Sequence, residues 1–79
     1  MFYTYILENA NGKLYIGQTN NPDIRVAWHN SGKSKFTKNK GPWKIIFKKS
    51  FENRGEAVTY EHYLKSLKNP SYIKNTIVR

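Results

Sequence analysis

Three side chains occupy positions that are unusual for residues with a purely structural role. Arg25 and His29 are four residues apart, so on a helix they would share one face, next to its apolar residues. Glu61 falls beside the apolar stripe of a second helix. A carboxylate at such a position needs a partner, because burying it unpaired costs several kcal/mol. That partner is either a lysine, Arg25 or a divalent cation.

The composition argues against several other kinds of reactive site. The chain has no cysteine and two histidines, which are too few ligands for a histidine-rich or cysteine-rich zinc centre. It contains no glycine-rich phosphate loop and no serine nucleophile elbow. No apolar run approaches the roughly 18 to 20 residues of a membrane span, and no signal-peptide pattern precedes the first strand. We therefore expect a cytoplasmic protein that has no membrane partner.

Positive charge dominates the sequence. Fourteen Lys and Arg against five Asp and Glu give a net charge of +9 over 79 residues. Such an excess on a small domain repels itself, and a polyanion is the usual partner that offsets it. We expect nucleic acid to bind to a basic segment that also supplies an aromatic ring for stacking. Its residues are Lys33, Lys35, Phe36, Lys38, Lys40 and Lys44. Nothing resembles a base-reading helix, so we expect recognition of the backbone or of shape.

Local patterns predict the elements that position these residues. Runs of aromatic and β-branched residues predict strands, and N-capping residues followed by helical apolar spacing predict helices. The predicted strands are Phe2–Glu8, Lys13–Gln18 and Trp43–Phe51, and the predicted helices are 22–30, 54–68 and a short one beginning at Pro70. The order ββαβαα predicts a single domain over residues 1–79. Its class is α+β, a three-stranded, mainly antiparallel sheet with flanking helices.

The turn between the first two strands decides whether Tyr5 and Tyr15 can share a site. A two-residue turn would put them on opposite faces of the sheet, because side chains alternate along a strand. A three-residue loop over 10–12 puts them on the same face. Asn9 suits the first turn position and Gly12 the fourth, so we predict the three-residue loop.

These residues resemble the motifs of the GIY-YIG endonuclease superfamily, and the resemblance extends over nearly the whole chain. The first motif corresponds to Tyr3-Thr4-Tyr5, which keeps only the final tyrosine, and the second is intact as Tyr15-Ile16-Gly17. The arginine, the histidine one helical turn later and the glutamate of the next long helix are Arg25, His29 and Glu61. The HNSGK and FTKNKGPW segments look most like the small stand-alone bacterial branch. That branch is related to the nuclease domains of DNA repair enzymes.

The chain departs from the family pattern at several positions. Gln18 stands where repair-type members often carry a lysine, and the loop lacks the second histidine of some members. The family's asparagine near the C-terminus corresponds either to Asn69 or to Asn75. Gly17 fits the pattern, since a missing side chain lets a backbone or a substrate approach closely.

The resemblance implies a metal-dependent endonuclease that hydrolyses phosphodiester bonds in DNA, with Mg²⁺ or Mn²⁺ held by Glu61. Arg25 would stabilise the charge that develops on the phosphate. Tyr15 would activate the attacking water, and because a phenol ordinarily has a pKa near 10, it needs nearby positive charge to do so. Tyr5 and His29 would orient this water or help to accept its proton.

Two other functions are compatible with the sequence. One is a catalytically weak or inactive nucleic-acid-binding module on the same fold. In such a module the five residues would be scattered, or a lysine would pair with Glu61. The other is a basic protein-interaction or RNA-associated domain. The sequence also allows a protein partner that positions the domain, and it leaves the oligomeric state open.

Overall fold

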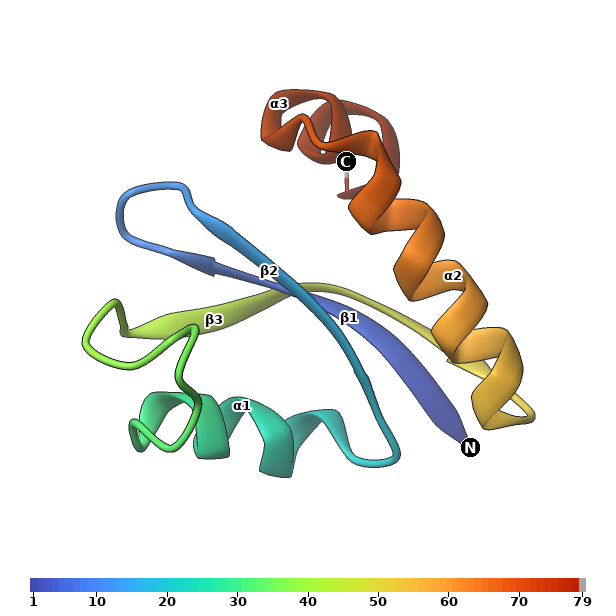
Figure 1. Ribbon diagram of the computed structural model, residues 1–79, viewed down its shortest axis with the longest axis horizontal. Coiled ribbons are helices and arrows are strands. Elements are labelled where there is room, and N and C mark those ends of the chain that lie inside the picture. Colours follow the sequence, from blue (N-terminus) through green and yellow to red (C-terminus); the bar gives the residue numbers. More distant parts are fainter. Residues whose placement is uncertain (79) are drawn as a thin grey trace.

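An antiparallel sheet of three strands forms the centre of the computed structural model, which describes residues 1–78 (Figure 1). The strands are ordered β2-β1-β3, so β1 is central and the other two are edge strands. Their bounds are Phe2–Asn9 for β1, Leu14–Thr19 for β2 and Trp43–Phe51 for β3. The helices are α1 (Pro22–Asn30), α2 (Arg54–Leu67), α3 (Pro70–Ile73) and a π-helical turn, η1 (Lys74–Val78). The predicted α+β fold with the order ββαβαα is confirmed.

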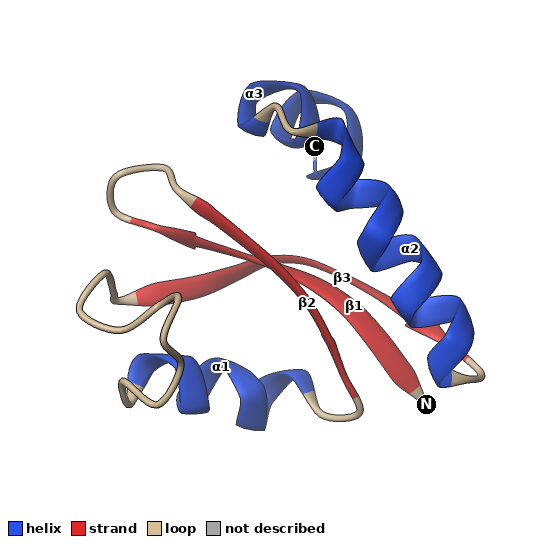
Figure 2. Cartoon of the chain, viewed as in Figure 1, coloured by secondary structure: helices blue, strands red, loops and turns tan. Residues whose placement is uncertain are grey.

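The helices cover both faces of the sheet, with α1 on one side and α2 on the other (Figure 2). The buried cluster on the α1 face contains Tyr5, Leu7 and Trp43, and the cluster on the α2 face contains Ile6, Leu64 and Ile73. Successive residues of β1 contribute to different cores because side chains alternate along a strand. A small domain thereby obtains two thin cores from one central strand.

A bulge in β3 interrupts this alternation. Ile6 pairs with Phe47 and Leu7 pairs with Ile45, so Ile46 is left over between them. The extra residue lets Ile46 and Phe47 both pack against the cluster of Ile6, whereas Ile45 packs against the cluster of Leu7. Sequence patterns predict the strand but not the bulge, because the bulge depends on which residues meet across the sheet.

The hairpin between β1 and β2 has the three-residue loop that the sequence predicts. The N–H of Asn9 donates to the carbonyl of Lys13 over 3.1 Å, and Gly12 has a φ of +79°, which glycine adopts without steric cost. The resulting register puts Tyr5 and Tyr15 on the same face of the sheet. The prediction of a shared face is confirmed.

Asparagine side chains begin all three α-helices by accepting a hydrogen bond from a backbone N–H of the first turn. The capping residues are Asn21, Asn53 and Asn69. Helix α2 ends at Leu67, one residue earlier than predicted, because Lys68 has a left-handed φ of +54°. The predicted C-terminal helix is divided into α3 and η1. Within residues 1–78, no helix is both long and apolar enough to cross a membrane.

Candidate active site

The rings of Tyr5, Tyr15 and His29 lie together on the α1 face of the sheet. The hydroxyl oxygen of Tyr5 is 3.0 Å from Nε2 of His29. The ring centre of Tyr15 is 4.6 Å from that of His29 and 6.4 Å from that of Tyr5. Tyr5 comes from β1, Tyr15 from β2 and His29 from α1. The hairpin register and the packing of α1 on the sheet together bring three of the five predicted catalytic residues into contact.

Gly17 makes room for this arrangement. It pairs with Tyr5 across the hairpin, and a Cβ added to Gly17 would lie 2.6 Å from the hydroxyl oxygen of Tyr5 and 2.8 Å from Cζ. The ring of Tyr5 therefore crosses directly over the glycine. What approaches Gly17 is a side chain of the neighbouring strand, not the backbone or substrate that the sequence suggested.

The imidazole of His29 is bonded at both nitrogens. Nε2 meets the hydroxyl of Tyr5, and Nδ1 is 2.9 Å from Oγ1 of Thr37. A neutral imidazole has one N–H donor and one acceptor nitrogen, so the directions of the two bonds depend on each other. All three residues are at most 2% exposed. Thr37 therefore connects the basic loop to Tyr5 through a buried chain of hydrogen bonds.

Burial controls the protonation of this chain. It raises the pKa of Tyr5 well above the usual value of a phenol; the neighbouring Tyr15 raises it further, Arg25 opposes the increase, and Glu61 adds to it slightly. Burial also lowers the pKa of His29, and the positive charge of Arg25 lowers it further. At neutral pH, Tyr5 is therefore a protonated phenol and His29 a neutral imidazole.

Arg25 lies next to this group of rings. Its guanidinium carbon is 4.8 Å from the ring centre of Trp28, and its charge affects the pKa of both Tyr5 and His29. Within residues 1–78, Arg25 forms no ion pair with a carboxylate. Its N–H donors are thus available to an anionic group.

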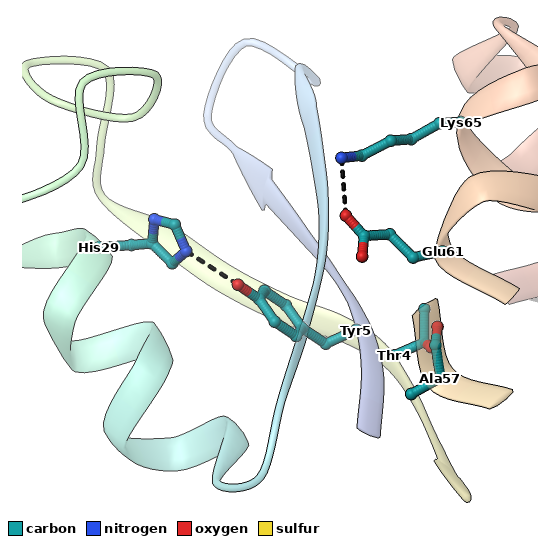
Figure 3. A network of polar contacts seen from close by, with 6 residues as sticks. All are labelled: Thr4, Tyr5, His29, Ala57, Glu61 and Lys65. Carbon is teal, nitrogen blue, oxygen red and sulfur yellow. Dashed lines mark hydrogen bonds and ion pairs between the residues drawn. The ribbon is translucent and has the colours of Figure 1, made fainter. Parts of the chain in front are cut away.

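Glu61 approaches the site from the other side of β2. Figure 3 shows the Tyr5–His29 pair and the Glu61–Lys65 pair on either side of this strand. Oε2 of Glu61 is 2.7 Å from Nζ of Lys65, and the two side chains are 14% and 52% exposed. The partner of Glu61 is therefore a lysine, and Glu61 is not in direct contact with the other four predicted residues in the part of the chain that the structure describes.

One buried side-chain oxygen on the α2 face lacks a hydrogen-bond partner. Oε1 of Gln18 is buried without a hydrogen bond. Gln18 pairs with Thr4 across the hairpin, and residues opposite each other in a sheet share a face. Thr4 donates to the carbonyl of Ala57 over 2.6 Å, one helical turn before Glu61. Residues 1–78 contain no group of three or more His, Cys, Asp or Glu side chains that could hold a metal ion. An ion at Glu61 would therefore need ligands such as this amide oxygen, water and substrate.

Comparison with known proteins identifies the family. The GIY-YIG catalytic domain family matches residues 1–75. The chain belongs to the GIY-YIG family. It is 43% identical over 68 residues to a UPF0213 protein of Clostridium perfringens, covering 85% of this chain and 73% of that protein. A UPF0213 protein of Lactococcus lactis is 35% identical over 83 residues, covering 99% and 80% of the two chains.

A solved structure agrees with this assignment. The solution NMR structure of a UPF0213 protein from Bacillus halodurans has a TM-score of 0.55 and 32% sequence identity, covering 96% of this chain and 86% of that one. The resemblance to the small stand-alone branch is confirmed. GIY-YIG is a nuclease family, which implies a nucleic acid substrate.

The two candidates for the GIY-YIG asparagine occupy different places. Asn69 caps α3 by accepting from the N–H of Tyr72 and lines a groove that Tyr15 also lines. Asn75 is exposed in η1. Asn69 is therefore the one that lies near the motif tyrosine.

The predicted nucleic-acid-binding residues are all at the surface. The five lysines are exposed, and Phe36 is 73% exposed. A hydrogen bond to the buried Trp43 holds the loop that carries most of them, since the indole N–H of Trp43 donates to the carbonyl of Thr37 over 3.0 Å. Sequence reasoning does not identify Thr37, because it is one polar residue in a lysine-rich loop and only the fold brings it to His29.

Proposed function

We propose that this GIY-YIG domain is a divalent-metal-dependent endonuclease that hydrolyses phosphodiester bonds in DNA. The observation that supports this most strongly is the direct contact of Tyr5, Tyr15 and His29, with Arg25 close enough to affect the pKa of two of them. Packing alone does not require that a phenol, an imidazole and a guanidinium come together on one face of the sheet. These groups suit the binding and hydrolysis of a phosphodiester.

Tyr15 is the residue that would meet the attacking water, since it is half-buried while Tyr5 is 2% exposed. Tyr5 stays protonated and is bonded to His29, so its role is to hold His29 against the ring of Tyr15 rather than to act as a base. Arg25 would donate to the phosphate oxygens, where charge increases in the transition state.

Glu61 would hold the metal ion. A carboxylate with an amide oxygen, water and substrate oxygens is a typical ligand set for Mg²⁺, and Mn²⁺ accepts the same ligands. Gln18 has an unpaired amide oxygen on the same face of the sheet, which supports its role as a second ligand. When bound, the ion would neutralise charge on the scissile phosphate and on the leaving oxygen.

Recognition of DNA would depend on the backbone or on shape. The exposed lysines of the basic loop can bind phosphates of any sequence. We therefore expect cleavage that depends on the structure of the substrate rather than on its base sequence.

The pairing of Lys65 with Glu61 favours a second candidate function. A lysine on this carboxylate is what an inactive nucleic-acid-binding module would show. However, a partly exposed pair four residues apart on a helix contributes only about 0.3–0.5 kcal/mol, so a divalent ion could displace the ammonium. We therefore place the endonuclease first.

The test is cleavage of labelled duplex, single-stranded and branched DNA with Mg²⁺ or Mn²⁺. We expect the wild type to cut at least one substrate, and Glu61→Gln and Arg25→Gln to lower the rate by about 100-fold or more. Glu52→Gln and Arg54→Gln remove the same charges at exposed positions away from the site and should retain the wild-type rate.

Two outcomes would contradict the endonuclease. In the first, the wild type binds DNA but does not cut it, and Lys65→Ala does not restore cutting; the inactive module is then correct. In the second, the wild type cuts, but Glu61→Gln and Arg25→Gln cut as fast as their controls; the assignment of these residues is then wrong.

A further inference from the structure

A groove with a volume of about 490 Å³ runs along the edge of β2 toward the C-terminal part of α2. Tyr15 lines this groove and also contacts His29 in the candidate active site. Lys65 lines it as well and is the ion-pair partner of Glu61. The groove is therefore continuous with the candidate site, and its volume lies within the range of about 300–1,000 Å³ that is common for small-ligand sites.

The floor of the groove is apolar. Leu14 and Ile16 of β2 lie over Leu64 of α2 and Ile73 of α3. Leu14 and Ile16 are half-buried and form the accessible part of this floor, whereas Leu64 and Ile73 are buried beneath them. Because β2 is an edge strand, no further strand of the sheet covers it. An occupant of this floor would be planar or aliphatic.

The rim of the groove is positively charged. It carries four lysines from three parts of the chain: Lys13 before β2, Lys40 in the basic loop, and Lys65 and Lys68 at the end of α2. No aspartate or glutamate lines the groove. A ligand that contacts both the apolar floor and the lysines of the rim needs an apolar face with a negative charge close to it.

One aromatic ring stands at the mouth of the groove. Phe36 lines it and is 73% exposed, although burying such a ring would be favourable. An exposed phenylalanine between lysines is an arrangement on which nucleobases stack.

We propose that this groove binds an unpaired nucleotide of the substrate strand, next to the phosphodiester that is cut. Its base lies on the apolar floor against Phe36, and its phosphates contact the lysines of the rim. A base inside a duplex is paired and stacked on both sides, so it cannot enter. The preferred substrate class is therefore single-stranded DNA, or duplex DNA with a flap or bulge. This inference rests on the proposed nuclease function, because it assigns the substrate of that site.

The experiment measures the binding of fluorescent DNA in the presence of EDTA, by anisotropy. The probes are a duplex of about 12 base pairs, which is roughly one helical turn, the same duplex with a short single-stranded flap, and one of its strands alone. We expect the flap and the single strand to bind about tenfold more tightly than the duplex. Phe36→Ala and Lys68→Gln should remove most of this difference, since stacking on one aromatic ring has an effect of about this size.

The matched controls are Tyr63→Ala and Lys49→Gln. Tyr63 is a partly exposed aromatic residue of α2 outside the groove, and Lys49 lies on β3, the opposite edge strand. Both variants should keep the preference for unpaired DNA. Chemical-shift changes in the amides of Leu14, Ile16 and Phe36 on addition of the single strand would locate the base in the groove.

Each other outcome overturns the proposal. Equal affinity for duplex and flap does so, as does a loss of preference in the control variants equal to that in the groove variants. Displacement of the single strand by polyglutamate at the same charge concentration would assign the groove to an acidic polypeptide instead. Because binding is measured without metal, a preference for unpaired DNA in a protein that cuts nothing would refute the nuclease and leave the groove assignment standing. Cleavage without this preference would refute only the groove.

Discussion

The contact between Gly17 and Tyr5 shows how one residue without a side chain shapes the site. The phenol of Tyr5 lies over Gly17 because its hydroxyl bonds to His29 on the α1 side. Tyr5 is buried, so a Cβ at residue 17 would press against a ring that is enclosed by other side chains. The tyrosine and the glycine of the two motif segments are therefore a packing pair as well as neighbours in the hairpin.

Replacing Gly17 with alanine should displace the ring of Tyr5 and break its bond to His29. We expect Gly17→Ala to lower the free energy of unfolding by about 1–3 kcal/mol and to reduce any nuclease activity. Urea denaturation measures the first effect. Gly55→Ala is the control, because a Cβ there would lie no closer than 3.4 Å to its nearest neighbour and alanine favours the helix. Equal stability of the two variants would contradict the packing argument.

His29 is held neutral between Tyr5 and Thr37. Folding lowers its pKa, whereas the unfolded chain takes up a proton at this histidine once the pH falls below about 6.5. The unfolded state then binds more protons than the folded state, so stability decreases as the pH falls. The contribution of neutral His29 to the free energy of unfolding is complete above about pH 6.5. It is lost progressively as the pH falls from there to the lower pKa that His29 has in the folded state.

We therefore expect the free energy of unfolding to decrease between pH 7.5 and pH 5.5, over the range around the histidine pKa of about 6.5. In His29→Gln this dependence should be much weaker, because glutamine does not titrate. Urea denaturation at three pH values in this range measures it. His62→Gln removes the exposed histidine and should keep the wild-type dependence; an identical pH dependence in wild type and His29→Gln would refute the assignment.

Among the elements, the β1–β2 hairpin decides the geometry of the site, and Asn9 holds its register. Oδ1 of Asn9 accepts from the N–H groups of Asn11 and Lys13 at 3.0 and 2.9 Å, and Nδ2 donates to the carbonyl of Lys40. One side chain thus closes the turn and attaches the basic loop to it. The same loop supplies Thr37 to His29, so the hairpin and the loop support each other.

Asn9→Ala should destabilise both the turn and the loop. We expect a loss of about 2 kcal/mol, because the three backbone groups lose a partner at a largely buried position. Asn9→Asp keeps the acceptor oxygens and loses only the donor to Lys40, so its loss should be smaller. Cross-strand NOEs from Tyr15 report the register directly, and a hairpin unchanged in both NOEs and stability in Asn9→Ala would contradict this role.

Across the whole molecule, the positive charge is concentrated where the loop, the β2 edge and the end of α2 meet. Seven of the eleven lysines lie on the groove rim or in the exposed loop: Lys13, Lys33, Lys35, Lys38, Lys40, Lys65 and Lys68. Of these, Lys65 is paired with Glu61. An anion approaching the domain is therefore attracted toward the surface that contains Tyr15.

Binding to duplex DNA should weaken steeply with salt. Each lysine that contacts a phosphate contributes about one to the slope of log K against log salt concentration. We expect Lys38→Gln to reduce this slope by about one, whereas Lys49→Gln, on the opposite edge strand, should leave it unchanged. Titrations at four salt concentrations distinguish the two, and equal slopes in both variants would show that the charge is not localised.

Local patterns in the sequence predict most of the fold. Strands rich in aromatic and β-branched residues, three asparagine caps, and a turn with Asn9 first and Gly12 fourth lead to the observed elements and register. These features depend on residues close together in the chain. The bulge at Ile46 and the division of the last helix are not predicted, because they depend on contacts across the sheet and with the core.

The family can also be recognised from the sequence. The order and spacing of Tyr5, Tyr15, Arg25, His29 and Glu61 resemble those of the family's motifs, and both are properties of the chain alone. Only the tertiary structure decides which of these groups touch. It joins Tyr5, Tyr15 and His29, adds Thr37 behind them, and leaves Glu61 across β2 with Lys65. The reason is that contacts between residues far apart in sequence depend on the packing of α1 and α2 on opposite faces of the sheet, which no local pattern contains.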